Sequence, residues 1–279
     1  MQHPKLFLKV GDNDEFNIAD KVQGLEYLGD NATLAATNQL NQMASVDGAT
    51  FQYRSFSNYQ IPANFALKFR NWQDFKLAKH EITRLLATRQ PMRMRTDTET
   101  YIVRFVLPTM PTIAPAEPEA NYSLFTVNFD NPSGYRYSIF RSDADWGDAG
   151  SQFGMNLPTK KPSYHFTDKS FKIYNASDIT IDPFKQNHDL KIISKFNGGS
   201  MKLTNKTNNS EWSYNQSSNG SEQIILDGIT TTVNGQAASS RTDYGNITLN
   251  PGWNDIDVTG ADSVDITFSF PFIYLWVIS

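Results

Sequence analysis

Short runs of alternating apolar and polar residues, each ending at glycine, proline, asparagine or aspartate, dominate the chain. Runs with a period of two residues are typical of β-strands that bury one face. In the first half of the chain they predict strands over residues 50–57, 64–69, 92–95, 101–107, 123–130 and 135–141. The chain is therefore expected to be mainly β.

One segment, Trp72–Arg89, departs from this alternation and predicts an amphipathic helix. Its apolar residues recur at helical spacing and share one face: Phe75, Ala78, Ile82, Leu85 and Leu86. Asn71 suits the N-cap, Asp74 occupies the third helical position, and Pro91 ends the helix. One helix packed on several strands makes the first half an α+β domain.

The second half, from Ser163 onward, shows no helix pattern. We expect strands over residues 164–174, 178–181, 189–196, 200–205, 211–215, 223–227, 231–233, 245–249, 253–258 and 264–270. Four dipeptides that accept the positive φ angles of tight turns separate some of these strands: Asn197-Gly198, Asn219-Gly220, Asp227-Gly228 and Asn234-Gly235. Many short strands in so few residues predict a β-sandwich or jelly roll.

The length of 279 residues favours two domains. Glycine, proline, aspartate and serine cluster without periodicity over residues 142–162, which is typical of a connection. We therefore place an N-terminal domain at residues 1–145, a linker at 146–162 and a C-terminal domain at 163–279.

Charge and composition exclude several classes of function. The net charge is −4, and the longest basic run is the pair Lys160–Lys161, so a nucleic-acid partner is not expected. The absence of cysteine excludes disulfides, thiolate catalysis and cysteine-based metal sites. No secretory signal and no apolar run long enough to cross a bilayer is found, so no membrane association is expected.

Catalytic and metal-binding motifs are also missing from the sequence. None of HExxH, GxSxG, GxGxxG or GxxxxGK[ST] occurs, and His80 is interpreted as a surface position of the predicted helix. The acidic segments Asp143–Asp148 and Gly11–Glu15 do not fit the calcium-loop pattern, because the glycine at its sixth position is absent. We predict no catalytic residue, no cofactor, no metal site and no enzymatic activity.

Three aromatic residues of the second half are candidates for glycan contact. Trp212 and Tyr214 alternate on one predicted strand, and Trp253 begins another. Carbohydrates present apolar C–H faces and many hydroxyl groups, which aromatic rings and nearby polar side chains recognise. The opposing interpretation is that alternating aromatic residues of a sandwich face its core.

The order of several motifs resembles that of siphophage distal tail proteins. The clearest are Ile247–Gly260 (ITLNPGWNDIDVTG) and Asp265–Tyr274 (DITFSFPFIY), preceded by Leu203–Asn208 (LTNKTN) and Ile224–Asp227 (IILD). In the first half, the segment from Ser55 (SFSN), followed by a proline, an aliphatic strand and one helix, resembles the N-terminal domain of that family.

The resemblance implies an N-terminal domain that forms a hexameric ring and a galectin-like β-sandwich attached outside it. It also implies a structural role in the phage tail tip or baseplate, assembled in the bacterial host cytoplasm and carried in the virion. The implied partners are further copies of the chain, the tail tube protein, a tail-associated lysin or fibre protein and a receptor-binding protein for host adhesion.

The ring hypothesis selects candidate subunit contacts around the predicted 92–107 hairpin and the proline-rich segment that follows it. These are Tyr101, Val103, Pro111, Pro115 and Pro118, with packing within the domain as the alternative. The galectin sugar-binding constellation is absent, so the resemblance does not imply galectin activity. The alternative function is a carbohydrate-binding sandwich that recognises a host cell-wall polysaccharide.

Overall fold

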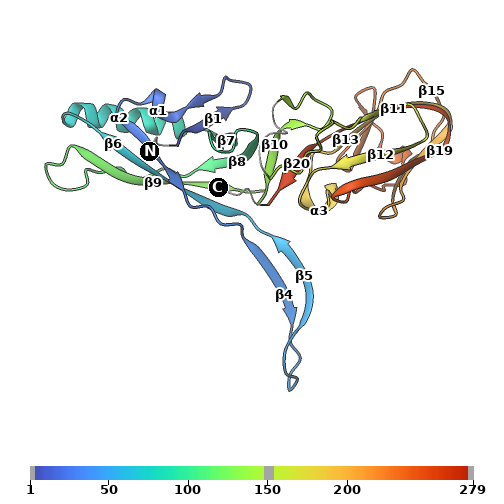
Figure 1. The fold of residues 1–279 in the computed structure, drawn as a ribbon, viewed down its shortest axis with the longest axis horizontal. Coiled ribbons are helices and arrows are strands. Elements are labelled where there is room, and N and C mark those ends of the chain that lie inside the picture. The colour runs from blue at the N-terminus through green and yellow to red at the C-terminus, as the bar shows by residue number, and fades with distance from the viewer. Residues whose placement is uncertain (1–3, 148–153, 276–279) are drawn as a thin grey trace. The chain divides into compact units, whose positions relative to one another are not determined.

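The computed structural model describes residues 4–147 and 154–275, and its chain divides into two compact units, Met1–Arg136 and Tyr137–Ser279. Figure 1 shows that strands make up most of both units, which confirms the mainly β prediction. The division falls before the expected linker of 146–162, so that strand β10 belongs mostly to the second unit.

The N-terminal unit is built on an antiparallel sheet in the order β2-β1-β7-β8-β9-β6-β3. Its elements are β1 (Leu6–Val10), β2 (Phe16–Asn17), α1 (Ile18–Lys21), β3 (Leu25–Asp30), β4 (Ala36–Asn41), β5 (Thr50–Phe56), β6 (Tyr59–Lys68), α2 (Trp72–Leu86), β7 (Met92–Thr96), β8 (Ile102–Pro108) and β9 (Tyr122–Asn131). Strands β4 and β5 pair only with each other and form a separate two-stranded sheet.

Helix α2 confirms the predicted amphipathic segment and ends three residues earlier than expected. Asn71 caps its N-terminus, because the Asn71 side-chain oxygen accepts a hydrogen bond of 2.9 Å from the Asp74 backbone N–H. The helix buries Phe75, Ala78, Ile82 and Leu86 in the same hydrophobic core as the inward side chains of the sheet. Burial of this stripe anchors the helix to the sheet.

The C-terminal unit contains a second antiparallel sheet of mostly short strands around two long ones. Its elements are β10 (Arg136–Arg141), β11 (His165–Phe166), β12 (Ser170–Asn175), α3 (Pro183–Gln186), β13 (Lys191–Asn205), β14 (Ser210–Tyr214), β15 (Ser218–Asn219), β16 (Ile224–Asp227), β17 (Thr230–Val233), β18 (Gln236–Ala237), a 3₁₀ turn (Ser239–Arg241), β19 (Gly252–Ser269) and β20 (Pro271–Tyr274). The expectation of no helix in this half is wrong at α3, which is a single turn with proline at its start.

Two predicted strand breaks are wrong, because β13 and β19 each run through a position that the sequence marks as a turn. Asn197-Gly198 is a β-bulge where the β13–β19 register shifts. Gly198 has φ +145°, and a Cβ there would lie 3.0 Å from the Ala261 Cα. The bulge at this glycine, where the backbones of the two strands approach closely, therefore bends the long strands instead of ending them.

Candidate functional site

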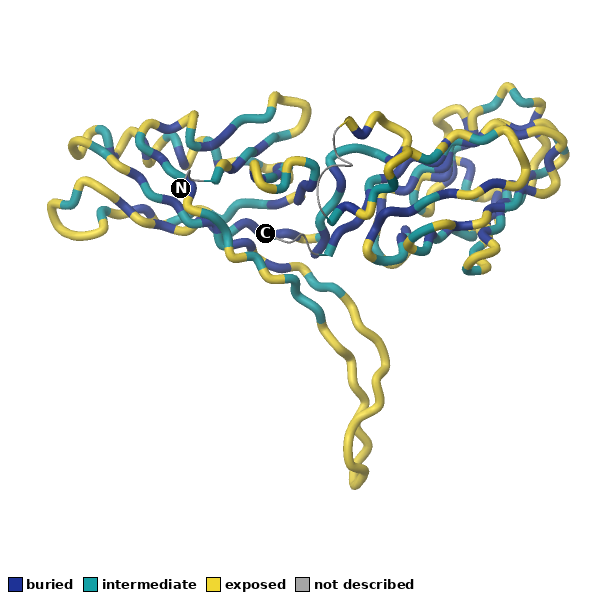
Figure 2. The backbone as a smooth tube through the Cα atoms, viewed as in Figure 1, coloured by how far each residue is buried: buried dark blue, intermediate teal, exposed yellow. Residues whose placement is uncertain are grey.

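The most exposed element of the N-terminal unit is the hairpin β4–β5 with its connecting loop, residues 36–56, which we call the arm. Figure 2 shows the arm extending away from the unit with almost every residue exposed. Five large apolar side chains of the arm are more than half exposed: Leu40, Met43, Val46, Phe51 and Tyr53. Apolar exposure on this scale marks an interaction surface.

The arm has no internal core to stabilise it. The two strands pair from Ala36↔Phe56 to Asn41↔Thr50, and no third strand continues this sheet in the described chain. An isolated two-stranded hairpin is at best marginally stable in water. The arm therefore gains order when its apolar residues are covered.

A buried ionic network lies in the main sheet, close in sequence to where the arm begins. Arg104 on β8 pairs with Asp30, the last residue of β3, at 3.3 Å and with Glu99 at 3.1 Å, and Arg136 pairs with Glu99 at 2.6 Å. Burial lowers the pKa of Arg104, but Asp30 and Glu99 outweigh burial and hold this pKa above its usual value. Tyr27 donates a hydrogen bond of 2.9 Å to Asp30, and burial raises the pKa of Tyr27.

A groove of about 520 Å³ lies at the N-terminal end of α2, beside the last residue of β6 and the first residue of β9. Apolar parts of Phe69, Leu77 and Tyr122 line the groove, with Lys68 and Asp74 among its polar lining. Leu77 is 63% exposed and Tyr122 is 40% exposed, so these two side chains leave apolar surface open to solvent.

The candidate subunit contacts around residues 101–118 differ in accessibility. Val103 is buried at 1% exposure, so its side chain is not available to a neighbouring subunit. Tyr101, Pro111 and Pro115 are half-buried, and Pro118 is exposed. These four residues stay candidates for subunit contact.

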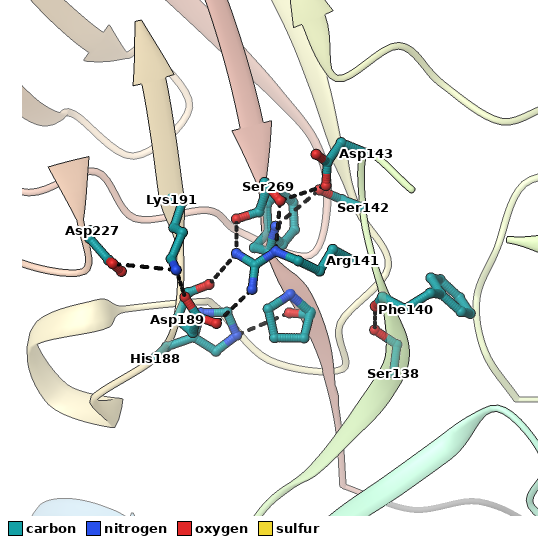
Figure 3. Close-up of polar contacts among 12 residues, drawn as sticks. Ser138, Phe140, Arg141, Ser142, Asp143, His188, Asp189, Lys191, Asp227 and Ser269 are labelled. Carbon is teal, nitrogen blue, oxygen red and sulfur yellow. Dashed lines mark hydrogen bonds and ion pairs between the residues drawn. The ribbon is translucent and has the colours of Figure 1, made fainter. Parts of the chain in front are cut away.

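In the C-terminal unit, Arg141 is the centre of the polar network drawn in Figure 3. Its guanidinium donates to the Asp189 carboxylate at 2.6 Å, to the Ser269 hydroxyl at 2.6 Å and to two backbone carbonyls. Ser269 in turn donates to Asp143 at 2.5 Å. The network joins β10, the segment before β13 and the end of β19.

His188 is buried beside this network, as Figure 3 shows. Its Nε2 lies 3.0 Å from the Pro271 carbonyl oxygen, and its Nδ1 has no hydrogen-bond partner among the described residues. Nε2 must be the donor in this bond, because a carbonyl only accepts. Burial lowers the pKa of His188 to about 4, against the Pro271 hydrogen bond and Asp189, which raise it.

The three candidate glycan contacts separate into two groups. Trp212 and Tyr214 are each 1% exposed and belong to the core, so the core interpretation of alternating aromatics holds for this strand. Their side chains cannot contact a glycan in this fold. Trp253 is 53% exposed, and its ring lies against the Tyr174 ring with centroids 5.2 Å apart.

The described residues form no group of three or more histidine, aspartate or glutamate side chains that could hold a metal ion. In the acidic segment 143–148, Asp143 bonds to Ser269 and Asp145 accepts from the Gly147 N–H, whereas Asp148 lies outside the described residues. His80 is exposed on α2. Within the described chain, no helix is long and apolar enough to span a bilayer.

Comparison with known proteins identifies the N-terminal unit and the fold. Residues 15–131 match the family model described as the phage tail protein RIFT-related domain. A search of curated proteins finds no match.

Among solved structures, the chain is similar to the Dit protein (gp 19.1) of phage SPP1, with 12% sequence identity and a TM-score of 0.65. The alignment covers 97% of this chain and 100% of that one, whose crystal structure is called a paradigm of the hub adsorption apparatus in phages that infect Gram-positive bacteria. Two chains from the activated phage p2 baseplate, one with strontium and one with calcium, align at 9% identity with a TM-score of 0.49, over 99% of this chain and all of theirs. The first likeness confirms that the fold is that of a distal tail protein.

Proposed function

Because residues 15–131 form a phage tail protein RIFT-related domain in a chain with the distal tail protein fold, we propose that the chain is a structural hub of a phage tail tip. In this role six copies form a closed ring that joins the tail tube to a tail-associated lysin or fibre protein. The ring also anchors a receptor-binding protein for host adhesion. The chain is assembled in the host cytoplasm, resides in the virion and has no enzymatic activity.

The observation in the structure that supports ring formation is the arm. A ring needs a heterologous contact, in which one surface of each copy binds a different surface of the next. The arm, with Leu40, Phe51 and Tyr53 exposed, supplies the first surface, and the groove at Leu77 and Tyr122 supplies a second on the same unit. We assign the arm to a neighbouring copy, which would cover its apolar side chains.

Charge supports this assignment. Residues 36–56 contain one acidic residue, Asp47, and one basic residue, Arg54, among many asparagine and glutamine side chains. A neutral arm that carries apolar and amide groups suits a permanent protein interface, since charged residues are depleted at the centre of such interfaces.

The C-terminal unit is proposed to be the galectin-like sandwich implied by the resemblance, placed outside the ring to contact peripheral tail components. The long strands β13 and β19 bend together at Gly198 and around Ala261, which allows one pair of strands to serve both layers of a sandwich. A second function, carbohydrate binding, is favoured by Trp253, which is the exposed one of the three candidate glycan contacts.

The test is the mass of the purified chain by size-exclusion chromatography with light scattering, followed by negative-stain imaging. One chain weighs 31.5 kDa, so a hexamer weighs about 189 kDa and should appear as a sixfold ring with a central hole. The triple variant L40S/F51S/Y53S should reduce the mass to that of one chain, because it removes the apolar surface of the arm.

Tyr244→Ser is the matched control, because Tyr244 is 75% exposed in the other unit, and it should leave the mass unchanged. A ring that survives the triple variant would refute the role of the arm. A wild-type chain that stays monomeric at all concentrations, alone and with its tail tube protein, would refute the hub proposal.

A further inference from the structure

The outward face of one half of the C-terminal sheet carries an ordered polar surface with aromatic residues at one end. Strands β12, β19, β13 and β14 lie side by side in this order, joined by the pairs Tyr174↔Trp253, Thr204↔Asp257 and Thr204↔Glu211. Along β19, Asn254, Ile256 and Val258 point into the core, so Trp253, Asp255 and Asp257 point outward. We call this outward surface the β12–β14 face.

The aromatic end of the face is held in a fixed orientation. The Tyr174 hydroxyl donates a hydrogen bond of 2.8 Å to the Asn156 carbonyl oxygen, and the Trp253 ring lies edge-to-face against the Tyr174 ring. Both residues belong to paired strands rather than to a loop. The half-exposed Trp253 ring is therefore a rigid apolar platform, which costs little conformational entropy when a ligand covers it.

The rest of the face consists of cross-strand ion pairs. Lys172 pairs with Asp255 at 3.3 Å, Lys202 pairs with Glu211 at 2.7 Å, and Lys206 pairs with Asp257. Ser170 also donates to Asp257 at 2.8 Å. The three cations and three anions cancel, so the surface offers many hydrogen-bond donors and acceptors but no net charge.

We propose that the β12–β14 face binds a neutral hexopyranose polysaccharide, with a sugar ring on Trp253 and neighbouring hydroxyl groups on the ion pairs next to it. A pyranose ring has an apolar C–H face that packs on an aromatic ring, and its adjacent hydroxyls both donate and accept hydrogen bonds. A Lys–Asp pair supplies one donor and one acceptor side by side. The face as a whole has no net charge, so it is not suited to an anionic polymer, which a basic surface would attract.

The spacing of the outward residues favours a polymer over a single sugar. Side chains two positions apart on a strand are separated by about 7 Å, so Trp253, Asp255 and Asp257 extend over about 14 Å. A ligand that contacts all three is an oligosaccharide or a longer chain. The proposal rests on the carbohydrate-binding function proposed above and does not depend on the ring, because every residue that carries it belongs to the C-terminal unit.

The experiment is native affinity electrophoresis of the full chain in gels that contain one polymer each. The neutral probes are hydroxyethylcellulose, barley β-glucan, galactomannan, yeast mannan and dextran, and the anionic probe is polygalacturonate. We expect at least one neutral polymer to retard the wild-type chain, and Trp253→Ala to weaken that retardation at least tenfold. Asp255→Asn should weaken it by a smaller factor, because it removes the charge of one acceptor and keeps the shape.

Trp72→Ala is the matched control, because Trp72 is 54% exposed, close to the 53% of Trp253, but belongs to helix α2 of the N-terminal unit, and it should migrate like the wild type. Circular dichroism of each variant verifies its fold, which an exposed position such as Trp253 should preserve. Three results would overturn the proposal: no retardation by any neutral polymer, retardation by polygalacturonate only, or equal retardation of the wild type and Trp253→Ala.

Discussion

The buried His188 makes the stability of the C-terminal unit depend on pH in a defined direction. Its pKa is lowered from 6.5 to about 4 in the folded chain, because burial disfavours the imidazolium and Arg141 adds repulsion, while the Pro271 carbonyl and Asp189 oppose this effect. In the unfolded chain the ring is exposed and titrates near 6.5. Between these two values the unfolded state binds more protons, so stability falls as the pH decreases.

The magnitude follows from the size of this interval. Each unit of pKa difference corresponds to about 1.4 kcal/mol, so the full effect is about 3 kcal/mol. The loss of stability is complete only below pH 4. Between pH 8 and pH 5 the loss of unfolding free energy is about 2 kcal/mol. Above pH 7 the contribution of His188 is constant.

The assay is urea unfolding at pH 5, 6, 7 and 8, followed by tryptophan fluorescence. Trp146 and Trp212 are buried in the C-terminal unit and report its unfolding. His188→Gln keeps a neutral donor for the Pro271 carbonyl but does not titrate, so the variant should lose about 2 kcal/mol of the wild-type pH dependence. Ile229→Ala is the control, since Ile229 lies in the same unit, is 55% exposed and carries no titratable group, and it should keep the wild-type slope.

An equal slope in the wild type and His188→Gln would refute this reasoning. It would mean that the buried ring is either protonated in the folded chain or exposed to solvent by local opening. Comparing slopes rather than absolute stabilities removes the cost of fitting glutamine into the histidine site.

Three further predictions concern the N-terminal unit. Arg104→Ala should reduce the unfolding free energy by about 3–5 kcal/mol in urea at pH 7, because it leaves Asp30 buried without its cation and Glu99 with Arg136 alone; a loss below 1 kcal/mol, the scale of an exposed pair, would contradict this. Asn71→Ala should cost about 1 kcal/mol through loss of the α2 cap, whereas Asn71→Ser should cost much less, and equal losses would exclude capping as the cause. The triple variant P111S/P115S/P118S should weaken the ring in light scattering and leave the fold unchanged by circular dichroism, because Ile113, the buried residue of that segment, is kept.

The sequence predicts well those elements in which local pattern and tertiary packing agree. Helix α2 combines an apolar stripe, an N-cap at Asn71 and a following proline, and all three signals act on the same residues. Strands β7 and β9 alternate because one face of each is buried. Such elements would be stable in many surroundings, which is why a single sequence suffices to find them.

Strand β4 could not be predicted by the same reasoning. Its sequence, ATNQLN, has no alternation because neither face of the strand is buried within the chain. Strand β5 is also exposed on both faces, but it was predicted because Phe51 and Tyr53 alternate with polar residues. Hydrophobic periodicity reports the burial of one face, so a strand such as β4, which buries neither face within the chain, need not show it.

The break expected at Asn197-Gly198 was wrong for a different reason. A glycine that permits a tight turn also permits a bulge, and only the partner strand determines which one forms. Here β19 continues past the bulge and pairs with β13 on both sides of it, from Asn205↔Ile256 to Lys191↔Ser269. Long-range pairing, which no local window contains, decides the outcome.

The burial of Trp212 and the exposure of Trp253 follow from the same long-range pairing. Both tryptophans lie on strands with alternating neighbours, and both are candidate glycan contacts when only the sequence is considered. Trp212 is opposite Leu203 and points inward with it, whereas Trp253 is opposite Tyr174 and points outward. A shift of one residue in either register would exchange core and surface. The functional candidates of this chain, the arm and the β12–β14 face, are therefore set by strand pairing, and their tests must substitute residues that the register places outside.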